Sequence, residues 1–355
     1  MTKSSRALLL CGVAAAALSA AAGSASASGG KETNWATVDN YGFLGLDLTV
    51  EGGYLFGSGD LPYAQYYDGA KDYSFDTGPG DGWTGKVGLT GRFEGGWDVN
   101  LFYSRLKSSE STGTASYDAS NTPVDWPVWN ILGWQSHSTP SGATSYNSAT
   151  VTTDLTADIV DLNVGYDVGL GSGSDGKLKL IGGLRYAAYT QTTSMNLFCS
   201  ASVFIPQNDC IPARLEVAQH RESRYRGFGP QFGANYSAPL SDNGLGVFGS
   251  LVGSLLYGNQ STNTYSEWKE GDPYSTRTSY NDNHFAYTID TQAGLSYKLP
   301  DQPLEVAAGY QLSWASGVRD SKNEAIATGS NNSFGSRRDD LLYHGPFVRL
   351  TVSLP

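Results

Sequence analysis

Segments in which apolar and polar residues alternate run along most of this chain. In residues 245–257, Leu245, Val247, Leu251 and Leu255 all fall on one set of alternate positions, and the residues between form a smaller or more mixed set. Successive side chains of a β-strand point to opposite faces, so a period of two predicts strands. Beyond the first residues, no apolar run is long enough for a membrane helix. The pattern therefore predicts a transmembrane β-barrel.

The alternating segments number ten, which favours an antiparallel barrel with both termini on one side. We expect strand cores at Phe43–Phe56, Trp83–Phe93, Trp97–Leu106, Leu155–Val168, Lys177–Tyr189, Tyr225–Ala238, Leu245–Tyr257, Phe285–Leu299, Leu304–Trp314 and Leu342–Leu354. The connections are alternately brief, such as 94–96 and 239–244, and long and polar, such as 107–154 and 190–224. Barrels of bacterial outer membranes have short periplasmic turns and long outer loops. A soluble β-sandwich or β-helix is the alternative, and it does not predict this regular alternation.

The two faces of these segments differ in charge. One face is apolar and is expected to contact lipid, with members that include Leu44, Leu46, Leu48, Val50, Leu162, Val164, Phe228, Phe232, Tyr287 and Ile289. The other face carries nearly every charge, because a charge placed against lipid is costly near the middle of the membrane. We therefore predict lumen-lining positions at Asp47, Glu51, Lys86, Arg92, Asp98, Asp161, Arg185, Asp290, Lys298, Glu305 and Arg349.

The charges on this inner face nearly cancel. A strongly selective ion channel would instead show a ring of one sign. Balanced charge predicts ion pairs across the lumen, which would narrow it. Eight-stranded barrels are just filled by side chains, so ten strands lie near the tight end of the range. The sequence therefore predicts a narrow lumen.

The first residues have the features of a leader that directs export. Lys3 and Arg6 precede an apolar stretch at Ala7–Ala22, and a small-x-small motif ends at Ala27. We predict a cleaved signal peptide at 1–27, a short periplasmic segment at 28–42 and a barrel domain at 43–355. A membrane-anchoring helix is the alternative for the first stretch, but no cluster of charges follows it.

Composition agrees with a barrel and argues against nucleic acid as a partner. The chain has 23 Lys and Arg against 34 Asp and Glu, a formal net charge of −11, which disfavours a polyanionic partner. Its mean hydropathy of −0.31 excludes a helical membrane protein but not a barrel, because half of each strand faces a polar lumen. The 22 tyrosines suit aromatic girdles at the membrane interfaces.

Two loop features add expectations about the outer surface. An exported chain meets an oxidising compartment, so Cys199 and Cys210 are expected to form a disulfide within one loop, with metal binding as the rival interpretation. A second loop holds Trp126, Trp129 and Trp134, which need cover from water. We expect them to pack into the barrel mouth and constrict it, or else to contact a neighbouring barrel or lipid. No metal or cofactor site is predicted.

Several segments resemble the Legionella-type major outer membrane protein family. They are 225–236 (YRGFGPQFGANY), 244–258 (GLGVFGSLVGSLLYG), 182–186 (GGLRY), 307–310 (AAGY) and 343–350 (YHGPFVRL). The resemblance implies an outer-membrane barrel with porin-like activity and no catalytic residues. One departure is the end of the chain at Pro355, where barrels commonly have an aromatic residue. Recognition by the barrel assembly machinery would then depend on Phe347 or Leu354, or be weaker.

These observations predict a narrow, porin-like channel in the outer membrane of a Gram-negative bacterium, passing small polar solutes by diffusion. Its expected partners are outer-membrane lipids, lipopolysaccharide and the assembly machinery, with a homo-oligomer left open. The alternative is a non-conducting structural barrel that acts through its outer loops. A rim hydrolase built on His284 and Asp290 is a further alternative, although the spacing of these residues does not single them out.

Overall fold

The computed structural model describes residues 42–58, 62–67, 72–76, 80–116, 128–131, 134–135, 148–169, 176–199, 215–268, 275–300, 302–319 and 340–355. These residues belong to one compact unit, Gly42–Pro355, which is described here by itself. The predicted signal peptide at 1–27 and nearly all of the predicted periplasmic segment lie outside the described residues. No helix in the described ranges is long and apolar enough to cross a membrane.

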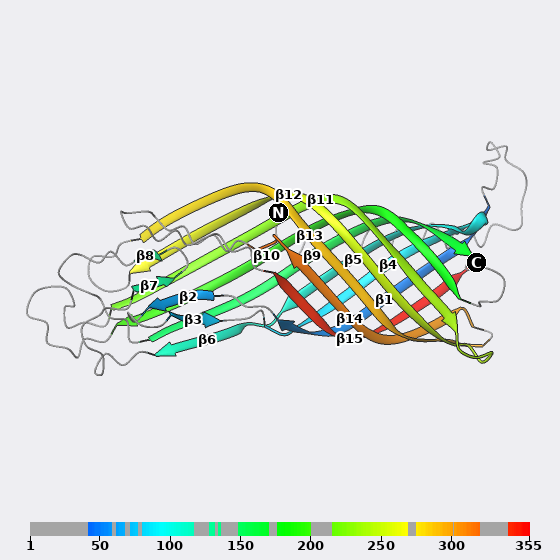
Figure 1. Cartoon of the computed structure of the whole chain (residues 1–355), viewed down its shortest axis with the longest axis horizontal. Helices are drawn as coiled ribbons and strands as arrows, with labels where there is room; N and C mark the ends of the chain where they lie inside the picture. The colour runs from blue at the N-terminus through cyan, green and yellow to red at the C-terminus, as the bar shows by residue number, and fades with distance from the viewer. Residues whose placement is uncertain are drawn as a thin grey trace, which may run out of the picture. The chain divides into compact units, whose positions relative to one another are not determined.

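Ten long strands form a closed antiparallel barrel (Figure 1), which confirms the fold expected from the alternation. They are β1 (Phe43–Ser58), β4 (Gly82–Phe93), β5 (Trp97–Ser108), β9 (Ser148–Gly169), β10 (Lys177–Cys199), β11 (Leu215–Pro239), β12 (Leu245–Trp268), β13 (Ser275–Lys298), β14 (Leu304–Ser316) and β15 (Leu341–Leu354). Each strand pairs with the next along the chain, and β15 pairs with β1 to close the wall. Every barrel strand therefore has two neighbours, so the wall has no open edge across the membrane.

The short connections join the strands at one end of the barrel. The one between β4 and β5 is a single 3-10 turn, η1 (Glu94–Gly96), in which Gly95 and Gly96 have φ values of 77° and 81°. Such positive φ values favour glycine, which explains the Glu-Gly-Gly sequence at this turn. We call the opposite end, with the long connections, the outer end.

The long connections contain strands that the sequence did not indicate. The first holds β2 (Pro62–Tyr67) and β3 (Asp72–Asp76), and the second holds β6 (Ser111–Ser116), β7 (Val128–Ile131) and β8 (Trp134–Gln135). Four of them form a separate small sheet in the order β3-β2-β7-β8, whereas β6 pairs with the outer part of β9.

Five barrel strands extend much further toward the outer end than predicted. Strands β9 to β13 have 22 to 25 residues each, whereas about 9–11 tilted residues suffice to cross a membrane. The ranges 190–199 and 215–224, for example, were expected to be loop and are strand. The reason is that the outer faces of these extensions are mainly polar and their inner faces mix polar residues such as Thr193 with apolar ones such as Met195, so no apolar alternation marks them.

Side chains alternate between the two faces of the barrel wall as the period of two requires. On β12, Leu255 and Tyr257 are exposed on the outer surface, while Leu256 between them is fully buried on the inside. The buried core of the protein therefore lies inside the barrel, and the apolar outer surface is left for lipid.

Candidate functional site

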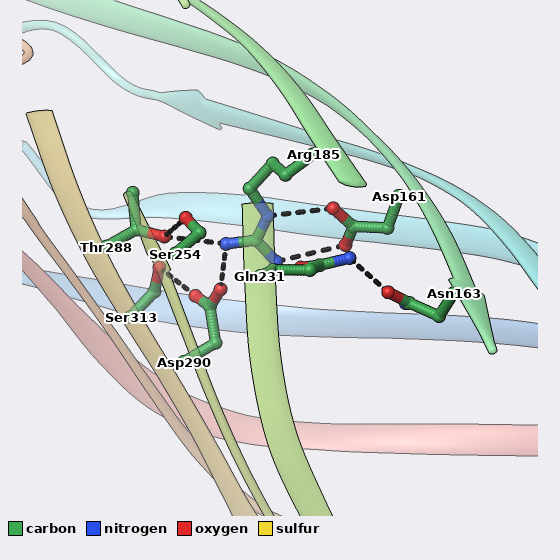
Figure 2. Close-up of polar contacts among 8 residues, drawn as sticks. All are labelled: Asp161, Asn163, Arg185, Gln231, Ser254, Thr288, Asp290 and Ser313. Carbon is green, nitrogen blue, oxygen red and sulfur yellow. Dashed lines mark hydrogen bonds and ion pairs between the residues drawn. The ribbon is translucent and has the colours of Figure 1, made fainter. Parts of the chain in front are cut away.

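A network of polar side chains crosses the barrel lumen around Arg185 of β10. Its Nε and Nη2 atoms donate to the two oxygens of Asp161 on neighbouring β9, at 2.7 and 3.0 Å. Its Nη1 donates to Asp290 Oδ2 at 2.5 Å and to Thr288 Oγ1 at 2.8 Å. Asp290 and Thr288 are both on β13. Strands β11 and β12 lie between β10 and β13 in the wall, so the Arg185 side chain reaches past their inner faces, through the lumen, to contact β13. Figure 2 shows its guanidinium group lying between the two carboxylates.

Neutral side chains complete this network. Ser313 of β14 donates to Asp290 Oδ1 at 2.6 Å, and the hydroxyls of Ser254 and Thr288 lie 2.5 Å apart. Gln231 of β11 donates to Asn163 of β9 at 2.5 Å, on the side of Asp161 in Figure 2. The Arg185 and Asp161 side chains are only 6% and 10% exposed. The Arg185 group therefore joins five strands through buried or partly buried hydrogen bonds, and the Gln231–Asn163 bond beside it joins β11 to β9. Such bonds are stronger in a medium of low dielectric constant.

A second cross-lumen group lies around Glu51. Arg349 Nε donates to Glu51 Oε2 at 2.7 Å across the β15–β1 pair, and Gln292 of β13 donates to Glu51 Oε1 at 2.9 Å. The Arg349 guanidinium also lies 5.1 and 5.3 Å from the ring centres of Phe248 and Phe347. The buried Glu51 carboxylate and the partly buried Arg349 guanidinium thus neutralise each other between two adjacent strands.

Of the other predicted lumen residues, Lys86 is a register partner of Glu51, whereas the rest lie closer to the end with the short turns. Arg92 contacts Asp47 at 3.4 Å, Lys179 pairs with Asp98, and the Lys86 ammonium lies 4.5 Å from the ring centre of Phe102. Lys298 and Glu305 are register partners next to a turn, and both are exposed. The structure therefore brings Arg185, Asp161 and Asp290 into one group and Glu51 and Arg349 into another, and it leaves Lys298 and Glu305 outside both.

An apolar layer fills the lumen on the outer side of the Arg185 network. Its members come from nearly every long strand and pack as one cluster, each no more than 5% exposed: Leu55, Leu155, Ala157, Ala187, Tyr189, Tyr225, Leu256, Ala286, Ala315, Val318, Leu341 and Tyr343. Four alanines on the wall leave room for the three tyrosine rings. The Tyr225 hydroxyl donates to the Leu256 carbonyl at 3.3 Å, so its polar atom does not interrupt the layer.

One part of the apolar layer comes from a turn and not from a strand. Directly after β14, Gly317 has a φ of 77°, and Val318 and Arg319 are buried. His284 Nε2 donates to the Gly317 carbonyl at 2.6 Å, and Arg319 Nε donates to Gln191 Oε1 of β10 at 3.0 Å. The turn is therefore held from two sides while Val318 packs into the layer.

The lumen becomes polar again on the outer side of this layer. Gln191 and Thr193 follow Tyr189 on the inner face of β10, and Gln260 of β12 donates to Ser223 of β11 at 2.5 Å. Along β10 the inner face thus runs from Arg185 through two apolar positions to Gln191. The apolar layer is consequently only a few residues deep, with mainly polar linings on both sides, although the outer lining also contains the buried side chains of Met195 and Val151.

Further outward, Asp154 of β9 lies beyond the part of the strand that crosses the membrane. Burial, together with the nearby negative charge of Glu110, raises the pKa of Asp154 above its ordinary value.

The tyrosines of the apolar layer are the functional positions that the sequence analysis missed. Tyr189 shares its face with Arg185, and Tyr343 shares its face with Arg349. The parity that assigned the charges to the lumen therefore also places these rings there. Tyrosine was instead interpreted only as an interface residue.

Other predicted site residues are placed in part or lie outside the described residues. Trp129 is in β7 and Trp134 in β8, but the positions of their side chains are not described, and Trp126 lies outside the described residues. Cys199 ends β10, whereas Cys210 lies outside the described residues, so the disulfide stays a prediction. The described ranges hold no cluster of His, Cys, Asp and Glu that fits a metal ion.

The residues proposed for a rim hydrolase have structural contacts in the lumen. His284 binds the Gly317 carbonyl, and its ring lies 5.3 Å from that of Tyr225. Asp290 is bound to Arg185 and Ser313. Both side chains are thus engaged in hydrogen bonds within the lumen.

The closed ten-stranded barrel, its apolar outer surface and its ionic interior define an integral β-barrel protein of a bacterial outer membrane. Residues 45–354 match the family described as Legionella pneumophila major outer membrane protein precursor. The chain belongs to this family, and it is an outer-membrane protein of the Gram-negative type. No curated protein sequence matches the chain significantly.

Solved outer-membrane barrels resemble the chain in fold. The outer membrane protease OmpT from Escherichia coli is 14% identical with a TM-score of 0.45, covering 91% of this chain and 99% of that one. A major outer membrane protein from Thermus thermophilus is 12% identical with a TM-score of 0.34, covering 87% and 99%. A Pseudomonas aeruginosa FadL homologue is 8% identical with a TM-score of 0.26, covering 88% and 90%. At these identities and TM-scores, none of the three supports an argument about function.

Proposed function

We propose that this protein is a narrow outer-membrane channel for small polar solutes whose lumen rests in a closed state. The observation that carries the proposal is the thin apolar layer between two polar linings. A hydrophobic constriction in a polar pore blocks ions and polar solutes, because water leaves it, and it conducts once its side chains move apart. The nearly balanced charges on the inner face favour passage without a strong preference for either sign.

The composition of the layer supports a movable closure. Most of its volume comes from tyrosine and leucine side chains, which can change rotamer without breaking the hydrogen bonds of the barrel wall. Val318 is contributed by a turn held through the Gly317 carbonyl and Arg319, so it can leave without unpairing a strand. A permanently closed barrel would not need an apolar side chain that can leave the lumen in this way.

A second candidate is a non-conducting barrel that acts through its outer surface. The burial of Tyr225 and Leu256, both 0% exposed, favours it, because side chains of a static plug are packed as tightly as those of any protein core. The strands β9 to β13 would then serve as a rigid support beyond the membrane.

Single-channel recordings in planar lipid bilayers separate the two candidates. The test variant carries Tyr225→Ala and Leu256→Ala, which remove two inner side chains. The matched control carries Phe228→Ala and Tyr257→Ala, which remove two register partners on the outer surface of the same two strands. We expect rare openings for the natural protein, frequent openings for the test variant, and no change for the control.

Two results would contradict the closed-channel proposal. A folded test variant that stays silent would favour the non-conducting barrel. Steady, equal currents from the natural protein and the test variant would show that the apolar layer does not close the lumen. Heat-dependent mobility on gels, which separates folded from unfolded barrels, would confirm folding of each variant before recording.

A further inference from the structure

The outer surface changes from apolar to polar at one position on each of three neighbouring strands. The unbroken apolar run on this face ends at the consecutive register partners Phe228 of β11, Tyr257 of β12 and Phe285 of β13. Two residues further toward the outer end, on the same face, the register partners are Arg226, Asn259 and Asn283. The change falls at the same place on all three strands, so it is a property of the surface and not of one strand.

This change marks the level of the lipid headgroups in the outer leaflet. Phe228, Tyr257 and Phe285 are each half exposed, and the rings of Tyr257 and Phe285 lie 5.0 Å apart. Aromatic side chains form belts where the acyl chains of a membrane meet its headgroups. The residues that follow immediately beyond such a belt face the polar part of the lipid.

Arg226 is the charged residue among these register partners. It is exposed, and among the described residues it makes no ion pair. Asn259, beside it in register, donates one of its two amide hydrogens to Asn283 Oδ1 at 2.9 Å, which leaves the other hydrogen available. Arg224 follows on the same face, where it pairs with Glu222. Arg226, Arg224 and Glu222 together carry one net positive charge.

A second arginine on the outer surface provides a contrast. Arg105 of β5 also points outward, but it lies 3.7 Å from Asp158 of β9. The same carboxylate accepts a hydrogen bond from the Tyr103 hydroxyl at 2.7 Å. The charge of Arg105 is therefore neutralised by Asp158, whereas no carboxylate of the described ranges forms an ion pair with Arg226.

We propose that Arg226 binds a phosphate group of a lipid headgroup in the outer leaflet. A guanidinium can give a phosphate two parallel hydrogen bonds, and this geometry favours phosphate over a simple point charge. Asn259 supplies a further N–H donor beside it. The acyl chains of the same lipid lie along the apolar surface formed by Phe228 and Tyr257. The positive charge, the donors and the adjoining apolar belt together match a phosphorylated lipid and not a soluble anion.

Binding of lipid A to the folded mature protein tests this site. The protein is reconstituted in nanodiscs of zwitterionic phosphatidylcholine, and retention of lipid A and of dephosphorylated lipid A is measured by native mass spectrometry. We expect Arg226→Gln to weaken lipid A binding about fivefold, the usual contribution of one basic residue near an anionic membrane surface. Arg105→Gln, the matched control, should change it less than about twofold, because Asp158 already neutralises that arginine.

We expect three further results from the same binding measurement. Dephosphorylated lipid A should bind the natural protein no better than lipid A binds Arg226→Gln. Inorganic phosphate at millimolar concentration should not displace lipid A, and Arg226→Lys should lose less than Arg226→Gln because it keeps the charge. Unchanged binding by Arg226→Gln, equal losses for Arg226→Gln and Arg105→Gln, or displacement by free phosphate would each overturn the proposal. None of these outcomes depends on whether the lumen conducts.

Discussion

Replacing Arg185 with glutamine is expected to destabilise the barrel by about 3–5 kcal/mol. The arginine makes four hydrogen bonds, two to Asp161, one to Asp290 and one to Thr288. Glutamine has neither the charge nor the length to replace them. The substitution therefore leaves two carboxylates in the lumen with no cation between them.

The magnitude follows from how deeply these groups are buried. Asp161 is 10% exposed at its side chain, and Asp290 is 29% exposed. Each hydrogen bond to a charged group contributes about 1.5–3 kcal/mol, but contributions within one network are not additive. Removing one partner of a buried ion pair commonly costs about 3–5 kcal/mol, because the remaining charge stays buried. We use that range for the whole network and add no separate loss for Asp290. Water reaches Asp290 more easily than Asp161, so its unpaired charge costs less.

Urea unfolding of the barrel in lipid vesicles, followed by tryptophan fluorescence, measures this free energy. The matched control is Arg92→Gln. Its ion pair with Asp47 is 3.4 Å long, and the Arg92 side chain is 42% exposed, so we expect a loss of about 0–1 kcal/mol. Adding Asp161→Asn to Arg185→Gln should recover part of the stability by removing one of the unpaired charges. A loss below about 1 kcal/mol for Arg185→Gln, or one equal to the Arg92→Gln loss, would refute the argument that this network is buried and coupled.

Three further measurements use the same unfolding assay. An alanine Cβ at Gly229 would run into a backbone carbonyl of the adjacent strand, so Gly229→Ala should cost about 1–3 kcal/mol, and an unchanged midpoint would mean that the two strands are further apart. Tyr310→Phe removes the 2.5 Å contact between its hydroxyl and His344 Nδ1 on the outer surface and should cost about 0.5–1.5 kcal/mol, with no cost if lipid supplies a replacement partner. Burial and Glu110 raise the pKa of Asp154, so the folded protein binds that proton more tightly than the unfolded chain does. Stability should therefore fall as the pH rises through this pKa, and Asp154→Asn should remove that slope; an identical slope in the variant would contradict the assignment.

The strands that cross the membrane could be predicted because one of their faces meets lipid and the other does not. On β12, the contrast between Leu255 and Ser254 is large, so a period of two is visible in the sequence. The outer extensions of β9 to β13 have no such contrast. The run from Thr190 to Ser194 is polar on both faces, and its strand conformation depends on pairing with distant residues, which no local pattern reveals.

The charges of the candidate site were predictable from the sequence, but its apolar layer was not. Parity alone assigned Arg185, Asp161 and Asp290 to the interior, and the structure brings all three into contact. Which partners meet across a lumen depends on strand register and tilt, which alternation does not specify. The inward tyrosines were missed because tyrosine is equally suited to a membrane interface and to a packed protein interior. The turn at Gly317 was missed because it begins where a strand pattern ends.

Strand β1 pairs with β15, from Leu46 with Leu354 to Ser58 with Leu342. The barrel therefore cannot close until the last strand has been synthesised. A chain that stops before β15 keeps exposed hydrogen-bonding borders on β1 and β14, which invite aggregation with other chains. Evolution therefore cannot shorten this polypeptide from its C-terminal side one strand at a time.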